Sequence, residues 1–131
     1  MERPVRISWA AIATLVLMGA AVALHAYEQL AKSAEPSPIW FLWSMFPYSV
    51  CLLILLSCDS ALPAAFGTAA ALIFDFFGYH TVFVAPKAST SAIAFLFLPL
   101  WSAFVITPVV MFVVWLAVRW YTRRTRTAEP A

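Results

Sequence analysis

Residues 61–79 read ALPAAFGTAAALIFDFFGY, and this stretch decides the fold. It is apolar over a length that can cross a bilayer, yet it carries one acid, Asp75. On a helix of about 3.6 residues per turn, small and polar residues share one narrow stripe with that acid. The stripe consists of Ala64, Thr68, Ala71, Asp75 and Gly78. Because a carboxyl group is costly in hydrocarbon, we expect this packing stripe to face protein supplied by three further helices.

The composition is that of an integral membrane protein. The chain has 131 residues, of which 64% are hydrophobic and 11% are charged. A soluble domain carries about 25% charged residues, so this chain cannot cover a water-exposed surface. We expect residues 1–131 to form a single membrane domain, with no room for a soluble catalytic domain.

Four apolar segments predict an all-α, polytopic bundle of four transmembrane helices, over residues 7–27, 39–57, 61–79 and 92–118. A signal peptide is the alternative for the first segment, but its apolar core exceeds the usual 7–15 residues, so we expect a retained helix. Pro47 predicts a kink in the second segment. The turn of residues 58–60 is so short that the second and third helices should form an antiparallel hairpin.

The fourth segment has 27 residues, more than one perpendicular crossing needs. Tilt, bends at Pro99 and Pro108, or protrusion beyond the membrane would each absorb the excess. Such prolines line the substrate path in some transporters and are simple bends in passive bundles.

Orientation follows from the basic residues. The chain ends carry Arg3, Arg6, Arg119, Arg123, Arg124 and Arg126, whereas the two long loops, residues 28–38 and 80–90, carry only Lys32 and Lys87. This bias predicts that both termini are cytoplasmic. We expect the basic tail of residues 119–131 to hold lipid headgroups through Arg119, Arg123, Arg124 and Arg126, at about 1 kcal/mol per basic residue. Nucleic-acid binding would need a larger basic face on a folded module.

Asp75 is the sharpest candidate for chemistry. An intramembrane acid can relay protons, bind a cation or balance a cationic substrate. The structural alternative is an acid that fixes helix packing through hydrogen bonds or is wetted near the interface. Because only four residues separate Asp75 from Tyr79 near the predicted interface, we favour the structural interpretation at the level of sequence.

Other polar and aromatic groups collect with Asp75 at the predicted outer ends of the helices. They include His25, Glu28, Tyr79 and His80. Two histidines at similar depth could bind a metal or haem, and His25, Asp75 and His80 could form a metal triad. No motif accompanies either histidine, so we favour interfacial histidines bonded to loops, with no metal and no cofactor.

Several enzyme and transporter classes do not fit. Cys51 and Cys58 are not an outward-facing pair, which a disulfide-generating membrane enzyme needs. The first segment lacks the glutamate characteristic of small multidrug exporters, and Asp75 has no second intramembrane aspartate for proteolysis. No catalytic constellation is found.

Residues 89–101, STSAIAFLFLPLW, resemble a stretch that recurs in small four-span bacterial inner-membrane proteins of unassigned function. In these proteins a polar cap precedes an apolar helix with a proline-containing run. The resemblance implies four spans and a bacterial inner (plasma) membrane, and it brings no catalytic residue.

Two functions follow as expectations, and the sequence favours the first. The first is a non-enzymatic accessory, structural or protective (immunity-like) subunit that acts by helix–helix contact with a membrane protein partner or a second copy. Gly19 and Ala23 would add a close-approach face on the first helix. The second is a small oligomeric transporter or channel that uses Asp75 as a proton or cation site.

Overall fold

The computed structural model describes residues 8–84 and 91–127, and every regular element in these two ranges is a helix. The order is α1 (Trp9–Tyr27), η1 (Glu28–Lys32), α2 (Pro38–Ser44), α3 (Phe46–Ser57), α4 (Leu62–Tyr79), η2 (His80–Val84), α5 (Ser91–Trp101), η3 (Ser102–Ile106) and α6 (Thr107–Thr127), where η denotes a short π-helical segment. The prediction of an all-α fold is confirmed for the described residues.

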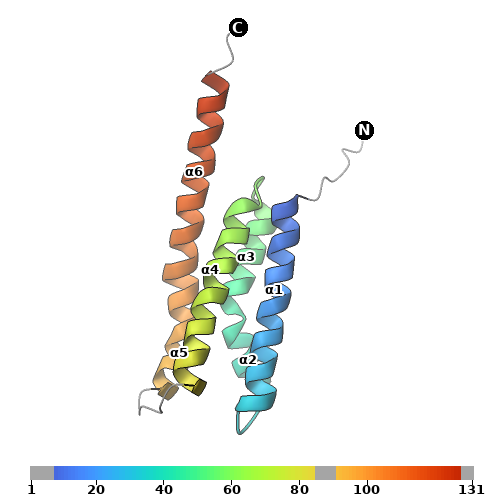
Figure 1. Cartoon of the computed structure of the whole chain (residues 1–131), viewed down its shortest axis with the longest axis vertical. Helices are drawn as coiled ribbons and strands as arrows, with labels where there is room; N and C mark the ends of the chain where they lie inside the picture. The colour runs from blue at the N-terminus through green and yellow to red at the C-terminus, as the bar shows by residue number, and fades with distance from the viewer. Residues whose placement is uncertain (1–7, 85–90, 128–131) are drawn as a thin grey trace.

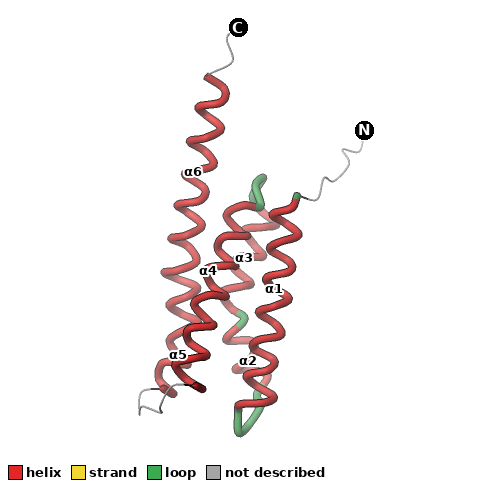
Figure 2. The backbone as a smooth tube through the Cα atoms, viewed as in Figure 1, coloured by secondary structure: helices red, strands yellow, loops and turns green. Residues whose placement is uncertain are grey.

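The helices form an up-and-down bundle. In Figure 1, α1 and α4 run in one direction, whereas α2–α3 and α5–α6 run in the other. The start of α1 and the end of α6 therefore lie at the same end of the bundle, and α6 extends well beyond its neighbours. Figure 2 shows that the described loops are short connections between the ends of these helices.

Within residues 8–84 and 91–127, three helices are long and apolar enough to cross a membrane: Trp9–Lys32, Leu62–Val84 and Leu96–Arg126. A fourth crossing is possible if Pro38–Ser44 and Phe46–Ser57, which meet at a bend of 50°, are one broken span. The four-span topology and the cytoplasmic location of the termini therefore stay predictions.

The bend between α2 and α3 has a clear local cause. Pro47 lies in the first turn of α3 and lacks the N–H that a continuous helix would use, so the backbone breaks at Met45. The kink predicted at Pro47 is confirmed by this 50° bend. Pro38 and Pro63 likewise lie in the first turns of α2 and α4, where the missing N–H has no intrahelical partner to lose.

The helices are longer than the sequence predicts at three ends. η1 continues α1 as far as Lys32, and η2 continues α4 as far as Val84, so the first part of each predicted loop is helical. α6 continues to Thr127, so most of the predicted tail is helix. A continued helix keeps backbone groups hydrogen-bonded where water is scarce, which favours extension past the apolar run. Residues 85–90, which include part of the predicted second loop, and residues 128–131 lie outside the described residues.

α4 is the central helix of the bundle. It contacts α1, α3 and α6, and it also packs against α5 and η3. Its buried residues are Pro63, Ala64, Gly67, Thr68, Ala71, Asp75 and Gly78, which include the whole packing stripe. The stripe is therefore covered by helices of the same chain, because only small side chains let neighbouring helices approach this closely.

Two glycines set the register of α4 against the antiparallel α5–α6 helix. A Cβ atom at Gly67 would lie 2.6 Å from Cε of Met111, and one at Gly78 would lie 2.6 Å from Cδ1 of Leu98. Because the two helices are antiparallel, this register places Ser102 at the depth of Asp75.

Candidate functional site

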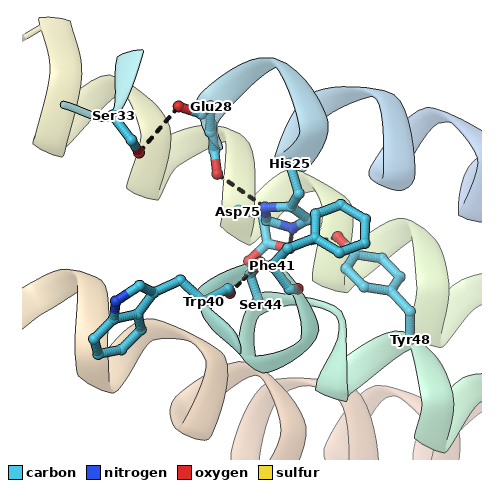
Figure 3. Close-up of polar contacts among 8 residues, drawn as sticks. All are labelled: His25, Glu28, Ser33, Trp40, Phe41, Ser44, Tyr48 and Asp75. Atoms are coloured by element: carbon cyan, nitrogen blue, oxygen red, sulfur yellow. Dashed lines mark hydrogen bonds and ion pairs between the residues drawn. The ribbon is translucent and has the colours of Figure 1, made fainter. Parts of the chain in front are cut away.

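Four buried side chains form one hydrogen-bonded cluster between α1, α3 and α4, which we call the acid–histidine cluster (Figure 3). The His25 ring lies between two carboxyl groups. Its Nδ1 lies 2.9 Å from Oε2 of Glu28, and its Nε2 lies 3.1 Å from Oδ2 of Asp75. The Tyr48 hydroxyl donates to the same Asp75 oxygen. None of the four residues is more than 7% exposed.

Local structure explains how His25 and Glu28 meet. They lie three residues apart at the junction of α1 and η1, and this spacing places them on one face of the helix. The loop then covers them, because Ser33 donates through both its backbone N–H and its hydroxyl to the Glu28 carbonyl. Ser37 N–H donates to Oε1 of the neighbouring Gln29, which is also buried.

The other two members come from the hairpin. Asp75 lies on the buried stripe of α4, and Tyr48 lies in α3 just after the bend at Met45. The Tyr48 ring packs against Ala21 and Ala71, so small residues on α1 and α4 make room for it. The bend, the hairpin and the small-residue stripe thus jointly position the phenol against the acid.

The hydrogen bonds constrain the protons of the cluster. Each ring nitrogen of His25 faces a carboxyl oxygen, so each contact requires one proton. Either the imidazole holds both protons between two carboxylates, or a neutral imidazole donates once and accepts once from a protonated carboxyl group. Both arrangements leave one net negative charge, and one further proton neutralises it. The cluster can therefore gain or release a proton while the same four side chains stay hydrogen-bonded.

A small cavity adjoins the cluster. It has a volume of about 20 Å³ and is lined by His25, Glu28, Ser44, Asp75, Gly78, Tyr79, Leu98 and Pro99. A space of this size holds about one water molecule. The arrangement thus fits a proton or a water molecule, and it is too small for an organic substrate.

Two further hydroxyls in the interior lack a hydrogen-bond partner among the described residues. They are Oγ of Ser102 and Oγ1 of Thr107, both on fully buried residues. Ser102 is the first residue of η3 and Thr107 directly follows its last, and η3 contacts α4. By the register of α4 against α5–α6, Ser102 lies at the depth of Asp75 and Thr107 at that of Ala71. A buried hydroxyl without a partner is destabilising, so this pair needs a functional or structural reason.

The structure brings together only some of the residues that the sequence singles out. His25 and Asp75 meet, whereas His80 is exposed at the start of η2. Tyr79 is partly buried and lines the small cavity, with its ring centroid 6.4 Å from that of Tyr27. The sequence analysis favoured hydrogen bonds from the histidines to loops, whereas His25 contacts the carboxyl groups of Glu28 and Asp75, which both lie in helical segments. Within residues 8–84 and 91–127, no group of three His, Cys, Asp or Glu side chains is placed to hold a metal ion.

The predicted headgroup arginines lie on the final part of α6. The Arg119 guanidinium lies 5.1 Å from the Trp115 ring centroid, and that of Arg124 lies 4.0 Å from the Trp120 ring centroid. Arg119, Arg123, Arg124 and Arg126 are all exposed. Cation–π contacts hold Arg119 and Arg124 beside the indole rings that suit a membrane interface.

Sequence reasoning missed the roles of Tyr48 and Glu28. Tyr48 sits within an apolar segment, and no spacing rule links it to an acid 27 residues later. Glu28 was assigned to a polar loop, although its i,i+3 spacing from His25 was a readable signal. A buried tyrosine needs a partner for its hydroxyl, and this rule could have directed attention to Asp75.

Comparison of the chain with protein-family models, with curated proteins and with solved structures found no match. The resemblance of residues 89–101 to small bacterial inner-membrane proteins therefore stays a prediction.

Proposed function

We propose that this protein is a small, oligomeric, proton-conducting or proton-coupled transporter of the bacterial inner membrane, with the acid–histidine cluster as its proton site. The observation that carries the proposal is the buried His25 ring bridging the carboxyl groups of Glu28 and Asp75. Ionisable residues inside a membrane are costly, and chains of acids and histidines are the usual proton relays of pumps and transporters.

The unpartnered hydroxyls support a route leading away from the cluster. Thr107 lies deeper in the bundle than Asp75, and Ser102 lies beside Asp75 in depth. Hydroxyls can accept and donate a proton in turn, alone or through an interposed water molecule. Four helices provide little room for a path through one copy, so the proposal requires a dimer or larger oligomer.

Proton flux into liposomes tests this function. The purified protein is reconstituted with an enclosed pH-sensitive dye, and a potassium gradient with valinomycin drives proton entry. We expect wild-type protein to increase the flux over empty liposomes and Asp75→Asn to abolish the increase, because asparagine cannot exchange a proton. Glu35→Gln is the matched control, since Glu35 is an exposed acid outside the cluster.

The assay has two refuting results. Wild-type protein that leaves proton flux at the level of empty liposomes contradicts conduction. Asp75→Asn protein that is folded and conducts like Glu35→Gln protein contradicts the assignment of the site. Circular dichroism and size-exclusion chromatography of each variant establish that the fold is retained.

A second function has its own supporting observation. Gly19 lies on the exposed face of α1 with open space around it, and Ala23, four residues later, is also exposed. Such a pair allows a further helix to approach closely. This favours an accessory or protective subunit that binds a partner helix along α1.

Affinity isolation in mild detergent distinguishes the second function. We expect Gly19→Leu to lose a stoichiometric membrane partner or a second copy, because leucine fills the space at the contact. Ala13→Leu is the matched control, because Ala13 is an exposed small residue on a different face of the same helix. Isolation of the wild-type protein as a monomer without a partner contradicts the accessory function.

A further inference from the structure

A second cavity lies at the opposite end of the bundle from the acid–histidine cluster, and we call it the turn cavity. It has a volume of about 410 Å³ and lies between the α3–α4 turn and α6. In Figure 1 this is the level at which α6 passes the α3–α4 turn and continues alone. The residues that bear on its chemistry are Asp59, Ser60, Trp115, Arg119 and Ser57.

The turn cavity contains one acid and one base that do not neutralise each other. Asp59 and Arg119 both line it, yet no ion pair joins them in the described part of the chain. At the start of α4 it is the Ser60 hydroxyl, and not Asp59, that accepts a hydrogen bond, from the Leu62 N–H. The carboxylate is therefore available for a ligand.

Arg119 is held in place for binding. Its guanidinium lies 5.1 Å from the Trp115 ring centroid, and both residues line the turn cavity. A guanidinium beside an indole face loses less conformational freedom when it binds an anion, and its planar donors match phosphate oxygens. Arg119 thus presents a positioned cation in the same cavity that Asp59 lines.

We propose that the turn cavity binds the headgroup of a zwitterionic phospholipid that carries a primary ammonium group, as phosphatidylethanolamine does. The Arg119 guanidinium donates to the phosphate, and the Asp59 carboxylate accepts from the ammonium. The surroundings favour a lipid as the source of this headgroup. Trp115 and Trp120 are exposed on α6, and tryptophan is typical of the membrane interface. The rest of the bundle exposes many large apolar side chains, as a surface in contact with lipid does. This site is independent of the proton site.

The charge arrangement selects among lipids. A quaternary ammonium group, as in phosphatidylcholine, has no N–H to donate to Asp59. A glycerol headgroup has no positive charge, so phosphatidylglycerol would place an anion in a cavity that already holds one carboxylate. Of these three headgroups, only ethanolamine satisfies both charged residues.

Native mass spectrometry of the full chain in detergent measures the preference directly. The probes are dioleoyl phosphatidylethanolamine, dioleoyl phosphatidylcholine and dioleoyl phosphatidylglycerol, each added at the same concentration. We expect wild-type protein to bind the ethanolamine lipid about fivefold more tightly than either other lipid, as for one well-placed exposed ion pair. Glycerophosphoethanolamine, which lacks acyl chains, should not compete at the same concentration.

Two variants assign the residues. Asp59→Asn should abolish the preference, so that the ethanolamine lipid binds about as tightly as the other two. Arg119→Gln should weaken the binding of all three lipids. Arg126→Gln is the matched control, because it removes the same charge from α6 outside the cavity.

Four results would overturn the assignment, of which three concern lipid binding by the wild-type protein and its variants. These are equal binding of the three lipids by wild-type protein, an ethanolamine preference that survives in Asp59→Asn, and an equal loss of lipid binding in Arg126→Gln and Arg119→Gln. Competition by glycerophosphoethanolamine as strong as that of the lipid would also overturn it, since the ligand would then be a soluble phosphodiester. Asp59, Arg119 and Arg126 are exposed, so their substitution should leave the helical circular dichroism spectrum unchanged.

Discussion

Replacing Tyr48 with phenylalanine removes one hydroxyl and leaves the rest of the side chain in place. That hydroxyl donates to Oδ2 of Asp75, which also faces Nε2 of His25. The Tyr48 ring packs against Ala21 and Ala71 and is only 2% exposed, so phenylalanine should keep these contacts. The substitution therefore isolates one buried hydrogen bond of the acid–histidine cluster.

The magnitude follows from the nature of the acceptor. A hydrogen bond to a charged group contributes about 1.5–3 kcal/mol in soluble proteins. Interhelical hydrogen bonds in membrane proteins reach at most about 1.7 kcal/mol, because the unfolded chain in the membrane also finds partners. We expect Tyr48→Phe to lower the free energy of unfolding by about 1–2 kcal/mol, which is roughly a 5- to 30-fold change in the folded-to-unfolded ratio.

Unfolding of the purified protein by sodium dodecyl sulfate in mixed micelles, followed by circular dichroism, measures this change. Tyr27→Phe is the matched control, because Tyr27 is 50% exposed and lies outside the cluster. The decisive measurement is a double-mutant cycle with Asp75→Asn. In that background the cost of Tyr48→Phe should fall, since the carboxyl acceptor is already gone.

Two results would refute the reasoning. If Tyr48→Phe is no more destabilising than Tyr27→Phe, the Tyr48 hydroxyl contributes nothing to the stability of the fold. If the free-energy costs of Tyr48→Phe and Asp75→Asn are additive, the two side chains are not coupled and the cluster is not one unit.

Three further predictions concern packing, the interior hydroxyls and orientation. Gly67→Leu should destabilise the fold by about 1–3 kcal/mol by forcing a side chain into α6, whereas Gly19→Leu, which meets open space, should leave detergent unfolding unchanged; equal effects would contradict the register of α4 and α6. Thr107→Val should retain or raise the free energy of unfolding because it removes an unpartnered buried hydroxyl, while lowering liposomal proton flux; unchanged flux would exclude this hydroxyl from the route. A membrane-impermeant maleimide should label the exposed Cys58 and not the buried Cys51 in inside-out vesicles, and labelling of Cys58 in intact spheroplasts would reverse the proposed orientation.

Most of the fold could be predicted from local patterns. Apolar runs of bilayer length predict helices, because a backbone in hydrocarbon must satisfy its own hydrogen bonds. Pro47 predicts the bend, since proline lacks the N–H that a continuous helix needs. The small-residue stripe with Asp75 identifies the face of α4 that is buried, because that face alone combines close approach with an acid that lipid would reject.

The membership of the acid–histidine cluster was decided only by tertiary structure. Sequence spacing cannot place Tyr48 beside Asp75, because their contact depends on the bend at Met45 and on the depth at which α3 packs against α4. His25 and His80 were equal candidates in the sequence, yet packing buried one and left the other exposed. Periodicity determines which face of a helix is polar, whereas the rotation and depth of each helix against its neighbours determine which polar groups meet.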